Sequence, residues 1–74
     1  MPELPRISGK QAIKNFERLG FKIVRQRGSH VVLRKENRGC VIPVHKELAL
    51  GTLRNAIKQA GISADEFINA YQNT

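Results

Sequence analysis

The side chain best placed for chemistry is His30, which follows the turn signal Gly28–Ser29 and stands close after Arg27. Imidazole exchanges protons readily near neutral pH, so histidine commonly serves as a general acid or base. Cations beside it would stabilise the negative charge of a phosphoryl-transfer transition state. RNA carries its own nucleophile, the ribose 2′-hydroxyl, and needs only a base. These residues predict, for an RNA substrate, cleavage through a 2′,3′-cyclic phosphate with His30 as the catalytic base.

Several polar side chains around His30 are suited to hold a phosphate backbone. Four are basic, one is the turn serine, and one is a second histidine that follows Pro43–Val44. This second histidine has two interpretations: a participant in the chemistry, or a strand-ending residue that hydrogen-bonds to backbone. His30 itself has a structural alternative, because a lone histidine on a strand is often a plain surface or packing residue. We assign RNA contacts to Lys22, Arg25, Arg27, Ser29, Arg34 and His45.

Other chemistries fit the residues poorly. Ser29 and His30 cannot form a dyad if they lie on one strand, because successive side chains point to opposite faces. Six scattered acidic residues give no obvious carboxylate cluster for Mg²⁺, and one cysteine with two histidines cannot complete a four-ligand zinc site. The segment 27–29 is too short for a phosphate-binding loop. We therefore expect no metal and no cofactor, and a core role for Cys40.

The charge of the chain is unevenly distributed. Its 74 residues include 13 Lys and Arg against 6 Asp and Glu, for a net charge of +7. Residues 6–46 hold eleven of the basic residues and only two acidic ones, Glu17 and Glu36. Such a basic segment favours a polyanionic partner, most simply nucleic acid, although a merely solvated basic surface gives the same composition.

The length predicts one small domain over 1–74 with a single core. The longest apolar run, 48–50, is far shorter than a membrane span, and no apolar stretch follows the first methionine. We expect a cytoplasmic protein with no membrane association.

Hydrophobic periodicity predicts the order α-β-β-β-α-α, an α+β fold. A helix of about eleven residues should begin at Gly9, after a capping box formed by Ser8 and Gln11. Period-two patterns predict three antiparallel strands over 21–26, 29–35 and 40–44, with turns at 27–28 and 37–39. Helical spacing returns over 49–60, with Gly61 as its stop. A short helix should follow Ser63 and extend through Tyr71.

The middle strand predicts which face of the sheet is covered. Val31 and Leu33 alternate with His30, Val32 and Arg34, so the helices should pack on the Val31–Leu33 row. His30 would then lie on the open side, beside exposed apolar side chains that include Val24. An apolar patch of this kind indicates a protein partner. A partner on this face would also cover His30 and regulate its activity.

Short segments in four groups, in order and at matching separations, resemble the HicA family of toxins from bacterial and archaeal toxin–antitoxin pairs. The resemblance extends from about Ile7 to Ile68. The matching segments are Ser8–Lys10 followed by Leu19–Phe21, then Arg27–His30, then Ile42–His45, and finally Gly51–Arg54 with Lys58–Ile62.

The resemblance implies a fold like that of double-stranded-RNA-binding domains: a three-stranded antiparallel sheet with helices on one face and a short extra C-terminal helix. It implies metal-independent cleavage of mRNA that blocks translation, and a HicB-type antitoxin that covers the active site. The family's catalytic histidine corresponds to His30, and its second histidine to His45. The chain departs from the expected pattern at Ala49 and Leu50, where basic or polar residues are usual.

Two other classes of protein are alternatives. A non-catalytic RNA-binding module would have the same element order, but it would hold phosphates with a lysine cluster at the start of the last long helix, where only Arg54 lies near. A helix-turn-helix DNA regulator could use the two C-terminal helices. Its recognition helix would carry Asp65 and Glu66, which repel DNA phosphates.

Overall fold

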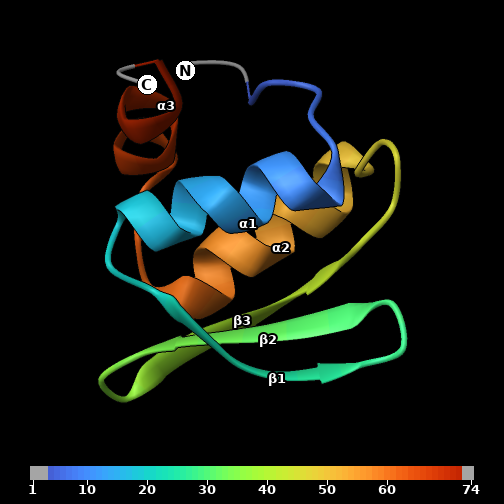
Figure 1. Ribbon diagram of the computed structural model, residues 1–74. Coiled ribbons are helices and arrows are strands. Elements are labelled where there is room, and N and C mark those ends of the chain that lie inside the picture. Colours follow the sequence, from blue (N-terminus) through green and yellow to red (C-terminus); the bar gives the residue numbers. More distant parts are fainter. Residues whose placement is uncertain (1–3, 73–74) are drawn as a thin grey trace.

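Three helices and three strands follow one another in the predicted order in a computed structural model that describes residues 4–72. The three helices lie together on one side of the sheet (Figure 1). The elements are α1 (Gly9–Arg18), β1 (Lys22–Arg27), β2 (His30–Lys35), β3 (Arg38–Pro43), α2 (Leu50–Ala60) and α3 (Ala64–Gln72).

Helix α1 begins where the sequence predicts. The Ser8 hydroxyl accepts a hydrogen bond from the Gln11 backbone N–H at 3.1 Å, and the Gln11 side chain accepts one from the Ser8 N–H at 2.9 Å. This reciprocal pair satisfies two backbone donors that the first turn of a helix leaves free. The helix ends before Gly20, whose φ of +100° suits a residue without a Cβ.

The strands form a meander in the order β1-β2-β3, and both pairs are antiparallel. Two predicted turns were misplaced. The first turn is Gly28–Ser29, not 27–28, because Gly28 with φ +58° opens a two-residue hairpin loop and Arg27 pairs with His30. The second is residues 36–37, not 37–39. Register is the physical reason: pairing of Lys35 with Arg38 places Cys40 opposite Leu33.

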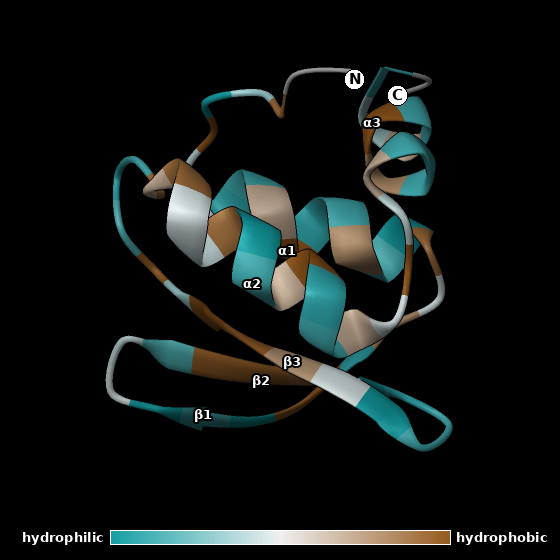
Figure 2. Ribbon diagram, turned by 180° about the vertical axis from the view of Figure 1, so that it is seen from behind, coloured by the Kyte–Doolittle hydropathy of each residue, from teal (hydrophilic) through white to brown (hydrophobic). Residues whose placement is uncertain are grey.

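One face of the sheet is buried under the helices, as the alternation of β2 predicted. Val31, Leu33 and Ile42 are buried on this face, whereas His30 and Arg34 are exposed on the other. We call the uncovered side the open face of the sheet. Helix α2 packs along β3, and Figure 2 shows this arrangement from behind.

The two C-terminal helices also follow their local signals. Helix α2 ends at Gly61, which takes a left-handed conformation with φ +73°. A second reciprocal capping pair joins Ser63 and Glu66 at the start of α3. Helix α3 is tied to α1 by the buried Asn15, whose amide donates to the Phe67 carbonyl at 2.8 Å.

Three phenylalanine rings occupy the core between α1, α3 and the start of β1. The Phe16 ring lies 5.4 Å from Phe21, edge-on, and 5.2 Å from Phe67. Cys40 is also buried, as expected, and burial raises the pKa of its thiol to about 12. A protonated, enclosed thiol is a packing group and not a nucleophile.

The predicted α+β fold, similar to double-stranded-RNA-binding domains, is confirmed. Within residues 4–72, no helix combines the length and apolar character needed to cross a bilayer.

Candidate active site

His30 is the first residue of β2 and its side chain is exposed. Two register pairs locate it. It lies opposite Arg27 on β1 and opposite Pro43 on β3, which ends at that residue. Pro43 cannot donate a backbone hydrogen bond, which suits its place at the end of an edge strand.

An open hollow of about 340 Å³ lies between this end of the sheet and α2. It is at the small end of the range for ligand-binding sites. The two histidines of the chain both line it, together with side chains from β3 and from one side of α2. The lining residues are His30, Val41, Pro43, His45, Thr52, Asn55, Ala56 and Gln59.

Polar side chains in this hollow are not used by the fold. Among residues 4–72, His30 and His45 form no side-chain hydrogen bond or ion pair with the protein, and the same is true of Thr52, Asn55 and Gln59. Side-chain donors and acceptors that stabilise nothing within the chain remain available to a ligand. The two imidazoles face the same open space, so both could act on one bound group.

His45 reaches the hollow because the segment after β3 is held on two sides by backbone hydrogen bonds. The Val44 N–H donates to the Ser29 carbonyl at 2.6 Å, which extends the β2–β3 pairing past its last strand residue. On the other side, the Gly9 N–H donates to the His45 carbonyl at 2.9 Å. These are main-chain hydrogen bonds, and the His45 ring itself forms none with backbone among residues 4–72.

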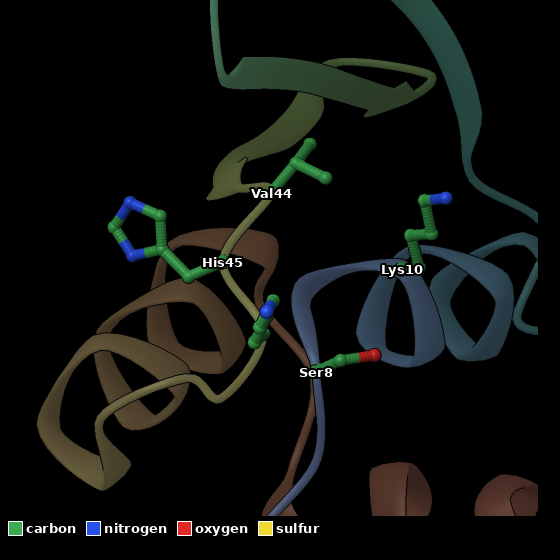
Figure 3. Close-up of a pocket in the computed structure, with 5 residues that line it drawn as sticks. Ser8, Lys10, Val44 and His45 are labelled. Carbon is green, nitrogen blue, oxygen red and sulfur yellow. The ribbon is translucent and has the colours of Figure 1, made fainter.

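Gly9 makes this arrangement possible. A Cβ at this position would collide with the Pro43 carbonyl oxygen and lie 2.9 Å from the Val44 Cα. The start of α1 therefore lies directly against the backbone that carries His45. Figure 3 shows Ser8 and Lys10 on the α1 side of this backbone and the His45 ring extending to the opposite side.

Four predicted cations share the open face with His30. By register, Arg27 lies opposite His30, Arg25 opposite Val32, and Lys22 opposite Arg34. Strict alternation along β1 would place Lys22 and Arg25 on opposite faces. A bulge between Ile23 and Arg25 inserts one residue and returns both cations to the same face.

Basic side chains on the open face are not neutralised within the described part of the chain. The single ion pair among residues 4–72 joins Arg6 and Glu47 at 3.6 Å, outside the sheet, and both side chains are largely exposed. Arg34 also borders a second shallow hollow, which shares Val41 and Gln59 with the hollow of the histidines. The open face therefore offers a positive surface that reaches the histidines.

Ser29 lies in the hairpin loop beside His30, with an exposed side chain. Its carbonyl already accepts the Val44 N–H, so the hydroxyl is the group left for a ligand. Of the predicted contact residues, Arg27, Ser29 and His45 lie next to His30 or line its hollow, whereas Lys22 and Arg34 pair with each other four residues farther along β2.

Exposed apolar side chains also occur on this side of the molecule. Val24 is 56% exposed, as the sequence suggested, and Val41 is 41% exposed. Ile23 is also 48% exposed, but it pairs with Leu33 and so belongs to the face toward the helices. Val32 is only half-buried.

Within residues 4–72, no three His, Cys, Asp or Glu side chains are grouped to hold a metal ion.

Sequence reasoning missed the wall of the hollow that α2 provides. Thr52, Asn55 and Gln59 follow one another at helical spacing of three and four residues, so they share one side of the helix. This polar stripe was a usable signal. Its closeness to His30, however, depends on the packing of α2 along β3, which spacing alone does not give.

Comparison with protein families gives a direct result. Residues 9–62 match the family described as the HicA toxin of bacterial toxin-antitoxin systems, which is more than half of the chain. The chain belongs to the HicA toxin family. A comparison with curated protein sequences found no match. The resemblance noted in the sequence is thereby confirmed.

The HicA match covers every part of the site. It includes α1 with Gly9, the whole sheet with His30, the segment with His45, and α2 with its polar stripe; only α3 lies beyond it. A toxin of a toxin–antitoxin pair functions with an antitoxin partner. The family therefore implies an antitoxin partner for this chain.

Replacing Gly9 by alanine should destabilise this HicA toxin, because the added methyl group forces the segment of Pro43 away from α1. We expect a loss of about 1–3 kcal/mol, as for overpacked sites, and a melting temperature lower by at least about 4 °C. Gly51→Ala is the matched control, since it also stands in the first turn of a helix and its Cβ would meet nothing within 4 Å. Equal melting temperatures for the two variants would contradict the close approach.

Proposed function

We propose that this HicA-family toxin is a metal-independent endoribonuclease that cleaves mRNA and so blocks translation. The observation that carries the proposal is the pair of imidazoles, His30 and His45, in one open hollow beside a positive surface. The ribose 2′-hydroxyl attacks the adjacent phosphorus, the bond to the 5′-oxygen of the next nucleotide breaks, and a 2′,3′-cyclic phosphate forms.

The two histidines divide the proton transfers between them. His30 accepts the proton of the 2′-hydroxyl, and His45 donates a proton to the departing 5′-oxygen. One proton is taken up and one is released, so the step is balanced and needs no oxidant, reductant or bound ion. Imidazole suits both roles because it exchanges protons near neutral pH.

Cations and uncharged polar groups supply the remainder of the site. Arg27, directly opposite His30, is suited to contact the scissile phosphate, with Arg25, Lys22 and Arg34 along the neighbouring backbone. The Ser29 hydroxyl and the amides of the α2 wall can accept or donate hydrogen bonds to ribose and base edges. RNA binding of this kind should weaken steeply as salt concentration rises.

The partner in this proposal is a HicB-type antitoxin that covers the open face. The exposed Val24 and Val41, with the half-buried Val32 opposite Val41, give such an interface its apolar centre. Val41 also lines the hollow of the histidines, so a partner seated there would exclude RNA from His30. Inhibition would then result from occlusion of the site.

Single-stranded RNA in excess EDTA is the substrate that tests the chemistry. The unmodified protein should cut it and leave 2′,3′-cyclic phosphate ends, whereas His30→Ala should lose at least about 100-fold in rate, the lower range for general acid–base catalysis. Its melting temperature should hardly change, because His30 is exposed. Binding of RNA without cleavage by either protein would instead indicate a non-catalytic RNA-binding module.

The pH dependence of the cleavage rate separates the two roles. A base must be deprotonated, so its titration makes the rate fall at low pH; an acid must be protonated, so its titration makes the rate fall at high pH. His45→Ala should therefore be slower and should lose the fall at high pH while keeping the fall at low pH. A His45→Ala variant whose cleavage rate still falls at both low and high pH would show that His45 is not the acid.

Replacing Val24 by glutamate should weaken antitoxin binding by leaving a charge in the apolar part of the interface. Cells that express Val24→Glu together with the cognate antitoxin should stop growing, whereas the antitoxin should protect cells that express the unmodified toxin. The matched control is Asn69→Glu, which adds the same charge at an exposed position of α3. Full protection against Val24→Glu, with normal binding, would place the antitoxin elsewhere.

A further inference from the structure

We propose that the exposed side of α1 forms a second RNA-binding track, which continues the path of the substrate away from the histidine hollow. The track consists of Lys46, Lys10, Lys14 and Arg18. This inference rests on the proposed function and extends it, because the contacts expected from the sequence lie on the open face, in the hairpin loop or in the hollow of the histidines, and none lies on α1.

The cations of α1 are arranged in a line. Lys10, Lys14 and Arg18 are spaced at four residues, so they follow one another along one side of the helix, and all three are exposed. Eight residues of helix span about 12 Å, which is the length of this line. Glu17 is the one acidic residue of α1, so the charge of the helix is predominantly positive.

A separate hollow at the start of α1 connects this line of cations to the histidines. Ser8, Lys10, Val44, His45 and Lys46 line it, and it lies where α1 begins. His45 belongs to both hollows, with its ring on one side of its backbone and Lys10 on the other (Figure 3). A strand of RNA whose phosphate lies between the imidazoles can therefore continue past His45 to Lys46 and Lys10.

The far end of the line has its own binding features. Lys14 and Arg18 line a further hollow with Gln11 and the half-buried Tyr71 of α3. A guanidinium, an ammonium group and an aromatic ring are the combination that holds single-stranded nucleic acid. The Arg18 guanidinium has one long hydrogen bond, 3.5 Å to the Asn15 side chain, which leaves most of its N–H groups for phosphate oxygens.

RNA fits this surface better than a protein partner does. Protein interfaces have an apolar centre that excludes water. The large exposed apolar side chains among residues 4–72 are Ile23, Val24 and Val41, all on the sheet, and α1 contributes none. A row of evenly spaced cations without apolar groups matches a phosphate backbone.

The experiment measures RNA affinity against salt concentration in a His30→Ala background, where a single-stranded RNA binds without being cut. The triple variant Lys10→Gln/Lys14→Gln/Arg18→Gln should lower the slope of log affinity against log salt by about 2, from about 0.7 per lost phosphate contact on a single strand. The matched control is Arg38→Gln/Arg54→Gln/Lys58→Gln. It removes the same charge from exposed positions that line neither of the two hollows with His45.

Equal slopes for the two triple variants would overturn the track, because net charge alone would then explain the change. Unchanged RNA affinity with weakened antitoxin binding would also overturn it and would assign the surface to an acidic protein segment. If the triple variant fails to fold, Lys14→Gln alone should lower the slope by about 0.7, with Lys58→Gln as its control. The unmodified protein could also fail to cut RNA while its RNA affinity still falls in the triple variant. This result would refute the nuclease activity and leave the second RNA-binding track in place.

Discussion

The site depends on one close backbone contact, between the start of α1 and the segment that leaves β3. Gly9 is the residue that permits it, since any Cβ there would meet the Pro43 carbonyl. Together with the hydrogen bond from Gly9 to the His45 carbonyl, this contact holds His45 between the two hollows. The β2–β3 pairing brings the segment that carries His45 next to His30, and the contact at Gly9 fixes this segment against α1. A domain too small for a deep cleft obtains a two-imidazole site in this way.

The sheet carries the cations of the site, and helix α2 forms one wall of its hollow. A bulge in β1 returns Lys22 to the face that carries Arg25 and His30, so the open face collects cations that the fold does not neutralise. Helix α2 adds an uncharged polar wall along β3. Burial keeps the Cys40 thiol protonated and out of the chemistry, so the imidazoles are the groups of this region that can exchange protons. The same open face carries exposed valines, which is consistent with a toxin whose substrate and antitoxin compete for one surface.

Local signals predicted much of this fold, and the failures have physical causes. The capping box at Ser8 and the helix start after Ser63 depend on neighbours in sequence, and both were predicted correctly. The alternation around Val31 correctly predicted the covered face. The turns were misplaced by a residue or more because pairing across the strands, and not turn composition, decides register. The β1 bulge, the contact of Gly9 and the α2 wall all depend on tertiary packing, so the meeting of His30 and His45 in one hollow could not be derived from spacing.

The most direct test of the account is whether cleavage requires the 2′-hydroxyl of the nucleotide that is cut. Once a cleavage position has been mapped in an RNA oligonucleotide, the same oligonucleotide is made with a single 2′-deoxynucleotide at that position. We expect the protein to bind it with unchanged affinity and to leave that position uncut, because the nucleophile is missing. Continued cleavage at the 2′-deoxynucleotide would contradict the account, since an attacking water would then be needed and the two histidines would have another role.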